Sequence, residues 1–323
     1  MDSYSDIIAD CMLNLMNSKI REDFKEFLLN NGDKEWLIVT DYHMIDSSIY
    51  ENYVAVFTIL PGSNHFIDIE TINKGLPKKL SQSKVTQSDL DFLKNLNHFT
   101  FAFIGEKDFR AAAPTAKDAK ASIDASLKNM RKWKNADECS EVIKFVQRYR
   151  QDANGSGFNL KLHNQMTLTA ATISAISLFI AKTLPLDVVY WFSDRDAIVS
   201  NFNSMVYTMV NLNLQSFAQK EKLREFYFVW PLDDAIPNAS GKLKALPMEP
   251  YIRIPDHFAA PIASSNFSAI DVQFLDKEKY QRILENVAAD SSNIVILRLE
   301  NEQGWTLQGY SISLNPSMSS IVE

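Results

Sequence analysis

Short runs of β-branched and aromatic residues recur along this 323-residue chain, and they constrain its fold more than any other feature. Such side chains favour extended backbone, because they pack well on the pleated surface of a sheet. Turn-forming residues bound the runs, as Pro61 and Gly62 do after the second one. We therefore predict a mixed sheet whose central strands are residues 36–39, 54–60, 99–103, 188–192 and 226–229. A weaker run at residues 66–72 is predicted to be a further strand.

Segments with a helical spacing of apolar residues separate and flank these runs. The pattern predicts helices at residues 5–30, 114–150, 166–184 and 197–222, the second with a break near Asn135. The third helix is the most apolar, but threonine, serine and lysine side chains interrupt it, whereas a membrane span needs about 20 predominantly apolar residues. We predict that this helix is buried against the sheet. The predicted fold class is α/β, with a mixed sheet flanked by helices.

The composition divides the chain into four segments. Residues 1–32 are predicted to form an N-terminal helix that ends near Gly32, since glycine accepts the left-handed conformation that ends helices. Residues 33–234 are predicted to be the α/β core domain. Residues 235–265 contain five prolines, which is typical of a long loop or an interdomain connection. Residues 266–323 are predicted to form a small β-α-β-β unit.

The net charge of −7 disfavours indiscriminate binding of nucleic acid over the whole surface. One segment departs from this balance, because residues 117–150 hold nine Lys or Arg against five Asp or Glu. Basic side chains with aromatic neighbours are what phosphate neutralisation and base stacking require. A solvated helix face is the alternative, and we favour it. If the segment binds nucleic acid, the contacting side chains are predicted to be Lys128, Arg131, Lys132, Lys134, Arg148 and Arg150.

Carboxylates directly follow three of the predicted strands. Asp41 ends the first strand, and Asp194 and Asp196 follow the fourth. Asp233 and Asp234 follow the fifth. Carboxylates at strand ends can converge on one edge of a sheet, where they would hold Mg²⁺ or Mn²⁺ for phosphodiester cleavage. We predict that Asp41, Asp194 and Asp233 are catalytic metal ligands. Asp196 and Asp234 are predicted as further ligands of the metal.

The order of the predicted elements resembles the ribonuclease H-like fold over residues 35–234, with three strands followed by helices, a strand, a helix and a strand. Nucleases and transposases of that fold place acidic residues near strand ends. The resemblance is one of topology, and the chain contains no diagnostic motif of any member. It implies a nuclease that uses Mg²⁺ or Mn²⁺. Without this resemblance the sequence indicates no cofactor.

Each acidic residue also has a structural explanation. The segment from Ser193 to Asp196 has the form of a capping box, in which a serine and an acid three residues later bond the amides of a helix start. Asp233 and Asp234 suit a turn before the proline-rich stretch. The sequence has no HExxH, GxSxG or P-loop motif, so zinc hydrolysis, serine chemistry and nucleotide binding are not indicated.

Two functions remain open. The acidic balance and the lack of a firm motif favour a non-catalytic interaction or regulatory protein, which acts through protein or nucleic-acid contacts. The alternative is the metal-dependent nuclease described above. The chain has only two cysteines, Cys11 and Cys139, and residues 1–10 lack the basic start and apolar run of a signal peptide. We therefore expect a cytoplasmic protein with no membrane partner.

Overall fold

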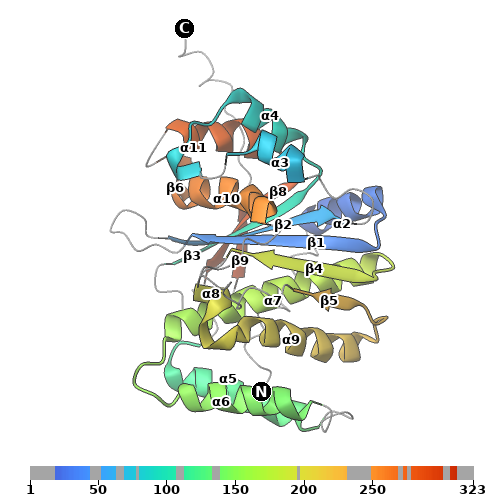
Figure 1. Ribbon diagram of the computed structural model, residues 1–323, viewed down its shortest axis with the longest axis vertical. Helices are drawn as coiled ribbons and strands as arrows, with labels where there is room; N and C mark the ends of the chain where they lie inside the picture. The colour runs from blue at the N-terminus through green and yellow to red at the C-terminus, as the bar shows by residue number, and fades with distance from the viewer. Residues whose placement is uncertain are drawn as a thin grey trace, which may run out of the picture.

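The computed structural model describes residues 19–43, 52–62, 69–77, 80–106, 113–132, 139–194, 197–230, 249–267, 272–274, 278–300 and 306–310. Its centre is a seven-stranded mixed sheet, which helices cover on both faces (Figure 1). The strands of this sheet are β1 (Glu35–His43), β2 (Asn52–Pro61), β3 (Phe99–Glu106), β4 (Val188–Ser193), β5 (Tyr227–Val229), β8 (Ile294–Glu300) and β9 (Thr306–Tyr310). The short strands β6 (Ser265–Phe267) and β7 (Val272–Phe274) pair separately.

The strands lie across the sheet in the order β5-β4-β1-β2-β3-β8-β9. β1, β2 and β3 form an antiparallel meander. β4 lies parallel to β1 on the other side, and β5 lies parallel to β4. At the opposite edge β8 is parallel to β3, and β9 is antiparallel to β8. The α/β class with a mixed sheet is therefore confirmed, and all five predicted central strands belong to it.

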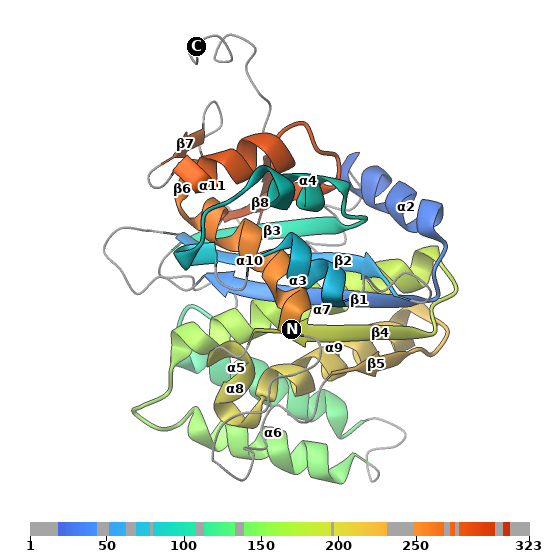
Figure 2. The same ribbon diagram turned by 45° about the horizontal axis from the view of Figure 1, so that its top comes forward.

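The two faces of the sheet bury two separate hydrophobic cores. Side chains of β1 alternate between them as the pleat requires, so that Trp36 and Ile38 join one core while Leu37 and Val39 join the other. The first core is covered by α2 (Lys19–Asn31), α7 (Leu160–Thr183) and α9 (Met205–Glu221), with α5 (Ala116–Met130) and α6 (Ser140–Asp152) stacked outside them (Figure 1). The second is covered by α3 (Ile69–Gly75), α4 (Gln87–Asn95), α10 (Glu249–Ala263) and α11 (Glu278–Ile283) (Figure 2).

Helix α7 is the buried helix that the sequence predicts. It is 24 residues long with a mean hydropathy of 1.4 in its most apolar window, of which 83% is buried inside the protein. Among the described residues it is the one helix long and apolar enough to cross a membrane. Three of its buried hydroxyls are satisfied locally, because Thr172, Ser174 and Ser177 each donate to the carbonyl four residues earlier. This bonding allows polar residues to occupy a helix in the middle of the core.

The predicted strand at residues 66–72 is wrong over the part that the structure describes. Residues 69–75 form helix α3, and residues 66–68 lie outside the described residues. Ile69 and Ile72 are three residues apart, which places both on one side of a helical turn. Ile72 is buried in the second core, and Ile69 packs against that core from its edge. The polar residues between them point to the helical period rather than to a half-buried strand.

The prediction of a loop throughout the proline-rich stretch is also wrong. Residues 249–263 form α10, although Pro255 and Pro261 lie inside the helix. An internal proline costs about 3 kcal/mol, because it removes one backbone hydrogen bond and crowds the preceding turn. Tertiary packing outweighs that cost here, since an apolar stripe at four-residue spacing is completely buried against β1 and β2. Its members are Ile254, Phe258 and Ile262.

The remaining helices follow the predicted segments with local breaks. The predicted helix at residues 197–222 is divided into α8 (Ala197–Ser200), a 3-10 turn η2 (Asn201–Asn203) and α9. The break coincides with Phe202 and Ser204, whose φ angles of 50° and 60° lie in the left-handed region. At the other end of the chain, α11 continues into a π-helical turn, η4 (Leu284–Ala288), before β8. Residues 266–323, predicted as a small unit, thus contribute β8 and β9 to the main sheet.

Candidate functional site

Asp41 and Asp194 lie side by side where the parallel pairing of β1 with β4 ends. The prediction that Asp41 ends its strand is wrong, because β1 continues to His43 and Asp41 pairs with Val56 of β2. Thr40 pairs with Ser193 in the register of the two strands, and the backbone N–H of Asp194 donates to the carbonyl of Thr40 at 3.1 Å. Asp41 and Asp194 are the next residues along each chain. By the alternation of the pleat, both side chains lie on the face that α10 covers. The structure therefore brings together two of the acids that the sequence singles out.

A third carboxylate belongs to the helical layer over this face of the sheet. Asp256 lies on α10 and is half-buried. Burial is the main cause that raises the pKa of Asp256 to about 6, and the negative charge of Asp194 acts in the same direction. The charge of Lys279 and a hydrogen bond from the backbone of Leu80 act in the opposite direction. We refer to Asp41, Asp194 and Asp256 as the carboxylate site.

The exposure of the three acids differs in a way that suits an open binding site. Asp41 is buried, Asp256 is half-buried and Asp194 is exposed. The site offers only carboxylate oxygens, which are the ligands that Mg²⁺ and Mn²⁺ prefer. Within the described ranges, no group of three or more His, Cys, Asp or Glu side chains has a geometry that holds a metal ion by itself. Mg²⁺ commonly needs fewer, because it takes one or two carboxylates and completes its shell with water and substrate phosphates.

The other predicted metal ligands, Asp196, Asp233 and Asp234, lie outside the described residues. The hydroxyl of Ser193 is buried and has no hydrogen-bond partner among the described residues, and the amide of Asp196, which the predicted capping box would use, lies outside them.

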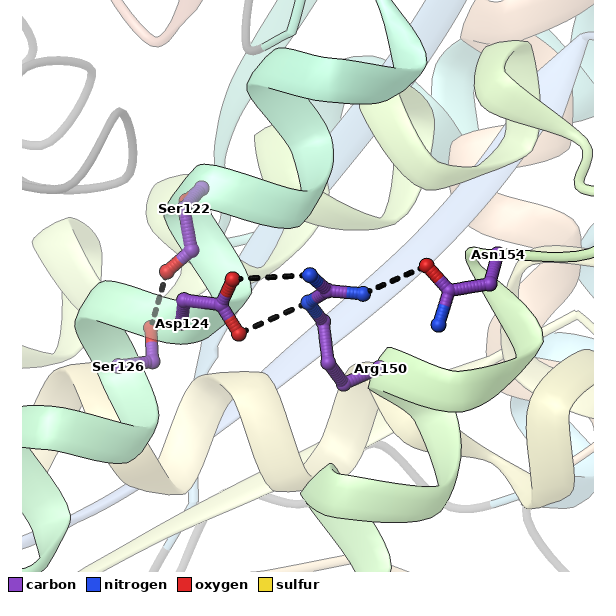
Figure 3. Close-up of polar contacts among 5 residues, drawn as sticks. All are labelled: Ser122, Asp124, Ser126, Arg150 and Asn154. Atoms are coloured by element: carbon purple, nitrogen blue, oxygen red, sulfur yellow. Dashed lines mark hydrogen bonds and ion pairs between the residues drawn. The ribbon is translucent and has the colours of Figure 1, made fainter.

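The basic segment lies on the other side of the sheet from the carboxylate site. Lys128, Arg131 and Lys132 are exposed at the end of α5, Arg148 is exposed on α6, and Lys134 lies outside the described residues. Arg150 is engaged within the protein: its guanidinium contacts both carboxylate oxygens of Asp124 on α5, at 2.8 and 3.0 Å, and donates to Asn154 at 2.9 Å (Figure 3). Arg150 thus links α6 to α5. Because α7 and α9 separate this helix pair from the sheet, these cations do not line the carboxylate site (Figure 1).

A second polar site lies in the helical layer on that far side. A cavity of about 50 Å³ opens between α5, α6, α7 and α9, and no charged side chain lines it. Inside it Tyr149 and His163 share a hydrogen bond of 2.6 Å between the tyrosine hydroxyl and Nδ1. Burial lowers the pKa of His163 to about 4, and burial with the charge of Asp152 raises the pKa of Tyr149. Both groups are therefore neutral at physiological pH, and the hydrogen bond is a structural link between α6 and α7.

Replacing Tyr149 with phenylalanine should lower the free energy of unfolding by about 1 to 3 kcal/mol, because it leaves the buried Nδ1 of His163 without its partner. Urea denaturation of the wild type and the variant measures the difference. Tyr227→Phe is the matched control, since the Tyr227 side chain is 77% exposed, and it should change stability by less than about 0.5 kcal/mol. Equal stabilities of Tyr149→Phe and wild type would show that the hydrogen bond contributes nothing.

Reasoning from the sequence misses Asp256. This residue lies in the stretch whose prolines predict a loop, and no apolar strand precedes it. One signal does exist in the sequence: Ile254, Phe258 and Ile262 recur every four residues, as on the buried side of a helix. Asp256 stands two residues from both Ile254 and Phe258, and two residues turn a helix by about 200°, so the stripe predicts the helix but places Asp256 on its opposite side.

No protein-family model, curated protein or solved structure matches this chain.

Proposed function

We propose that the protein is a metal-dependent nuclease, which hydrolyses phosphodiester bonds with Mg²⁺ or Mn²⁺ held at the carboxylate site. The observation that carries the proposal is the meeting of Asp41 and Asp194 where the parallel pairing of β1 with β4 ends, with the carboxylate of Asp256 on α10 influenced by the charge of Asp194. Three carboxylates from separate segments of the chain repel one another, which costs stability unless a cation joins them.

The arrangement of the strands supports this proposal. A ribonuclease H-like relationship is expected to show a three-stranded meander, followed after helices by two further strands. β1, β2 and β3 form that meander, and β4 and β5 are added in parallel next to β1. Asp194 directly follows β4, and Asp41 lies beside it near the end of β1, which is the kind of position that the resemblance implies. We propose that the protein shares this topology, with β8 and β9 extending the sheet beyond β3.

The proposed roles of the three acids at the cation differ with their exposure. Buried Asp41 would bind the cation on its protein-facing side, while exposed Asp194 would share it with a phosphate that approaches from solvent. A bound divalent cation supplies a polarised phosphate and a hydroxide at neutral pH. Asp256 would stay ionised next to Asp194 once a cation balances the two charges. Asp196, Asp233 and Asp234 are proposed as additional ligands from the segments that follow β4 and β5.

Titration of Mn²⁺ followed by calorimetry tests the site directly. We expect one or two binding events in the wild type, and at least about 100-fold weaker binding or none in Asp194→Asn, because each carboxylate contributes several kcal/mol to holding a divalent cation. Asp256→Asn should weaken Mn²⁺ binding in the same direction. Asp91→Asn is the matched control, since Asp91 is an exposed aspartate of α4 in the same helical layer, and it should bind Mn²⁺ as the wild type does.

Cleavage assays complete the test. Single- and double-stranded DNA and RNA are incubated with each protein and Mn²⁺ or Mg²⁺, and the wild type and Asp91→Asn are expected to cleave at least one of them. Asp194→Asn should lose at least about 100-fold in rate for the same reason as its metal affinity. If neither heat nor cleavage appears in the wild type, the nuclease proposal is wrong.

A non-catalytic interaction or regulatory protein is the second candidate, and one observation favours it. β5 is the end strand of the sheet, and it exposes Tyr227 and Val229, whose side chains are 77% and 41% accessible. Exposed aromatic and branched side chains on a strand at a sheet edge are suited to pairing with an extended segment of another protein. This function predicts that Tyr227→Glu abolishes a protein contact, whereas Asp194→Asn leaves it unchanged.

A further inference from the structure

Three basic side chains from the C-terminal helices hold the segment between α3 and α4. Arg253 on α10 donates to the carbonyl of Leu76 at 3.4 Å, and Arg282 on α11 donates to that of Val85 at 3.1 Å. Between them, Lys279 on α11 donates to the carbonyls of Leu80 and Ser83, the latter at 3.1 Å. These contacts join parts of the chain that are far apart in sequence. Hydrogen bonds from charged donors are stronger than those between neutral groups, so they fix the path of the segment.

Lys279 differs from the two arginines in what its contacts hold. Its two acceptors lie at the start of the 3-10 turn η1 (Leu80–Gln82) and directly after it. The backbone of Leu80 in that turn is hydrogen-bonded to the carboxylate of Asp256. The charge of Lys279 lowers the pKa of Asp256, whereas neither Arg253 nor Arg282 is among the groups that shift it. The ammonium group, the turn and the carboxylate therefore form one connected unit.

We propose that Lys279 is a positioning residue of the carboxylate site: it holds the turn η1 in place, and the turn in turn fixes the carboxylate of Asp256. This inference rests on the proposed function for its consequence at the metal. Groups that orient a metal ligand through a hydrogen bond commonly change metal affinity by about 10- to 100-fold when they are removed. The loss of Lys279 should have an effect of that size, because it frees the residue that donates to Asp256.

The test compares Lys279→Met, Lys279→Arg and Arg282→Met with the wild type. Methionine keeps the apolar length of the lysine side chain but removes its charge and its donors. Arginine keeps the charge and can donate again. Arg282→Met is the matched control, because it removes a cation from the same helix that bonds a carbonyl of the same segment without reaching η1 or Asp256.

Two measurements are made on each full-length protein. Calorimetry with Mn²⁺ should give about 10- to 100-fold weaker binding for Lys279→Met, partial recovery for Lys279→Arg, and a change of less than about threefold for Arg282→Met. Hydrogen exchange without metal should become faster at residues 80–83 in Lys279→Met, but not in Arg282→Met, since local opening follows the loss of the contacts that hold a turn.

The possible results separate this inference from the proposed function. If the wild type binds Mn²⁺ and Lys279→Met binds it equally well, this inference alone is overturned. Equal losses in Lys279→Met and Arg282→Met would also overturn it, because they indicate a general loss of stability. If the wild type shows no Mn²⁺ heat, the proposed function and the role of Lys279 at the metal both fail, even where exchange at residues 80–83 shows that Lys279 holds the turn.

Discussion

Replacing Ile176 with aspartate should leave the protein without a cooperative unfolding transition. Ile176 lies in the middle of α7, is completely buried, and belongs to the core that the helix shares with the sheet. The substitution removes a buried aliphatic side chain, at a cost of about 2 to 5 kcal/mol, and adds a buried carboxyl group without a partner, which costs several kcal/mol more. Folded domains have about 5 to 15 kcal/mol of stability in total. The sum of the two costs is therefore comparable with the whole stability.

Circular dichroism during a urea titration measures this expectation. Ile176→Val is the matched control, because it keeps an apolar side chain of similar shape and should cost only about 0.5 to 1.5 kcal/mol. The exposed position Lys161 at the start of the same helix provides a second control, and Lys161→Asp should change stability by less than about 1 kcal/mol. A soluble Ile176→Asp protein with the transition of the wild type would show that α7 is not packed as the structure has it.

The parts of the fold that could be predicted from the sequence are those in which local preference and tertiary environment agree. The runs around Val39, Val56 and Trp191 combine branched and aromatic residues with burial on both faces, so their strand character is evident without the fold. Helix α7 is similarly evident, since its apolar residues are more numerous than a single face requires. By contrast, Pro255 and Pro261 argue locally against a helix, and only packing against β1 and β2 makes α10 form.

The candidate site shows the same division. The positions of Asp41 and Asp194 near strand ends are evident from the sequence, but their meeting depends on β1 and β4 being parallel neighbours, which the sequence does not determine. The contribution of Asp256 depends on how α10 crosses the sheet, and no pattern near Asp256 in the sequence determines that crossing. The position of the basic segment relative to the acids depends on the same kind of knowledge. The structure places α5 and α6 on the far side of α7 and α9, away from α10 (Figure 1).

Stability should fall steeply as the pH decreases from about 7 to about 5. Burial lowers the pKa of His98 to about 4 and that of His163 to about 4, compared with an ordinary value of 6.5. Above pH 6.5 both the folded and the unfolded states are neutral at these residues, so they make no difference. As the pH falls below 6.5, only the unfolded state takes up the protons, which stabilises it until the folded state also binds them near pH 4. Each histidine should cost about 2 kcal/mol at pH 5, or about 4 kcal/mol for the pair.

Protonation of Asp256 has the opposite effect on stability, and this provides a check on the direction of the pH dependence. Burial raises its pKa to about 6, so below that pH the folded state takes up a proton more readily than the unfolded state does, and stability increases. Urea denaturation at several pH values should therefore show a larger acid loss for Asp256→Asn than for the wild type. His98→Gln and His163→Gln should each reduce the loss between pH 7 and pH 5 by about 2 kcal/mol, whatever their stability at pH 7. An unfolding free energy that stays constant over this range in Asp256→Asn would mean that the folded protein protonates its buried histidines as readily as the unfolded chain does.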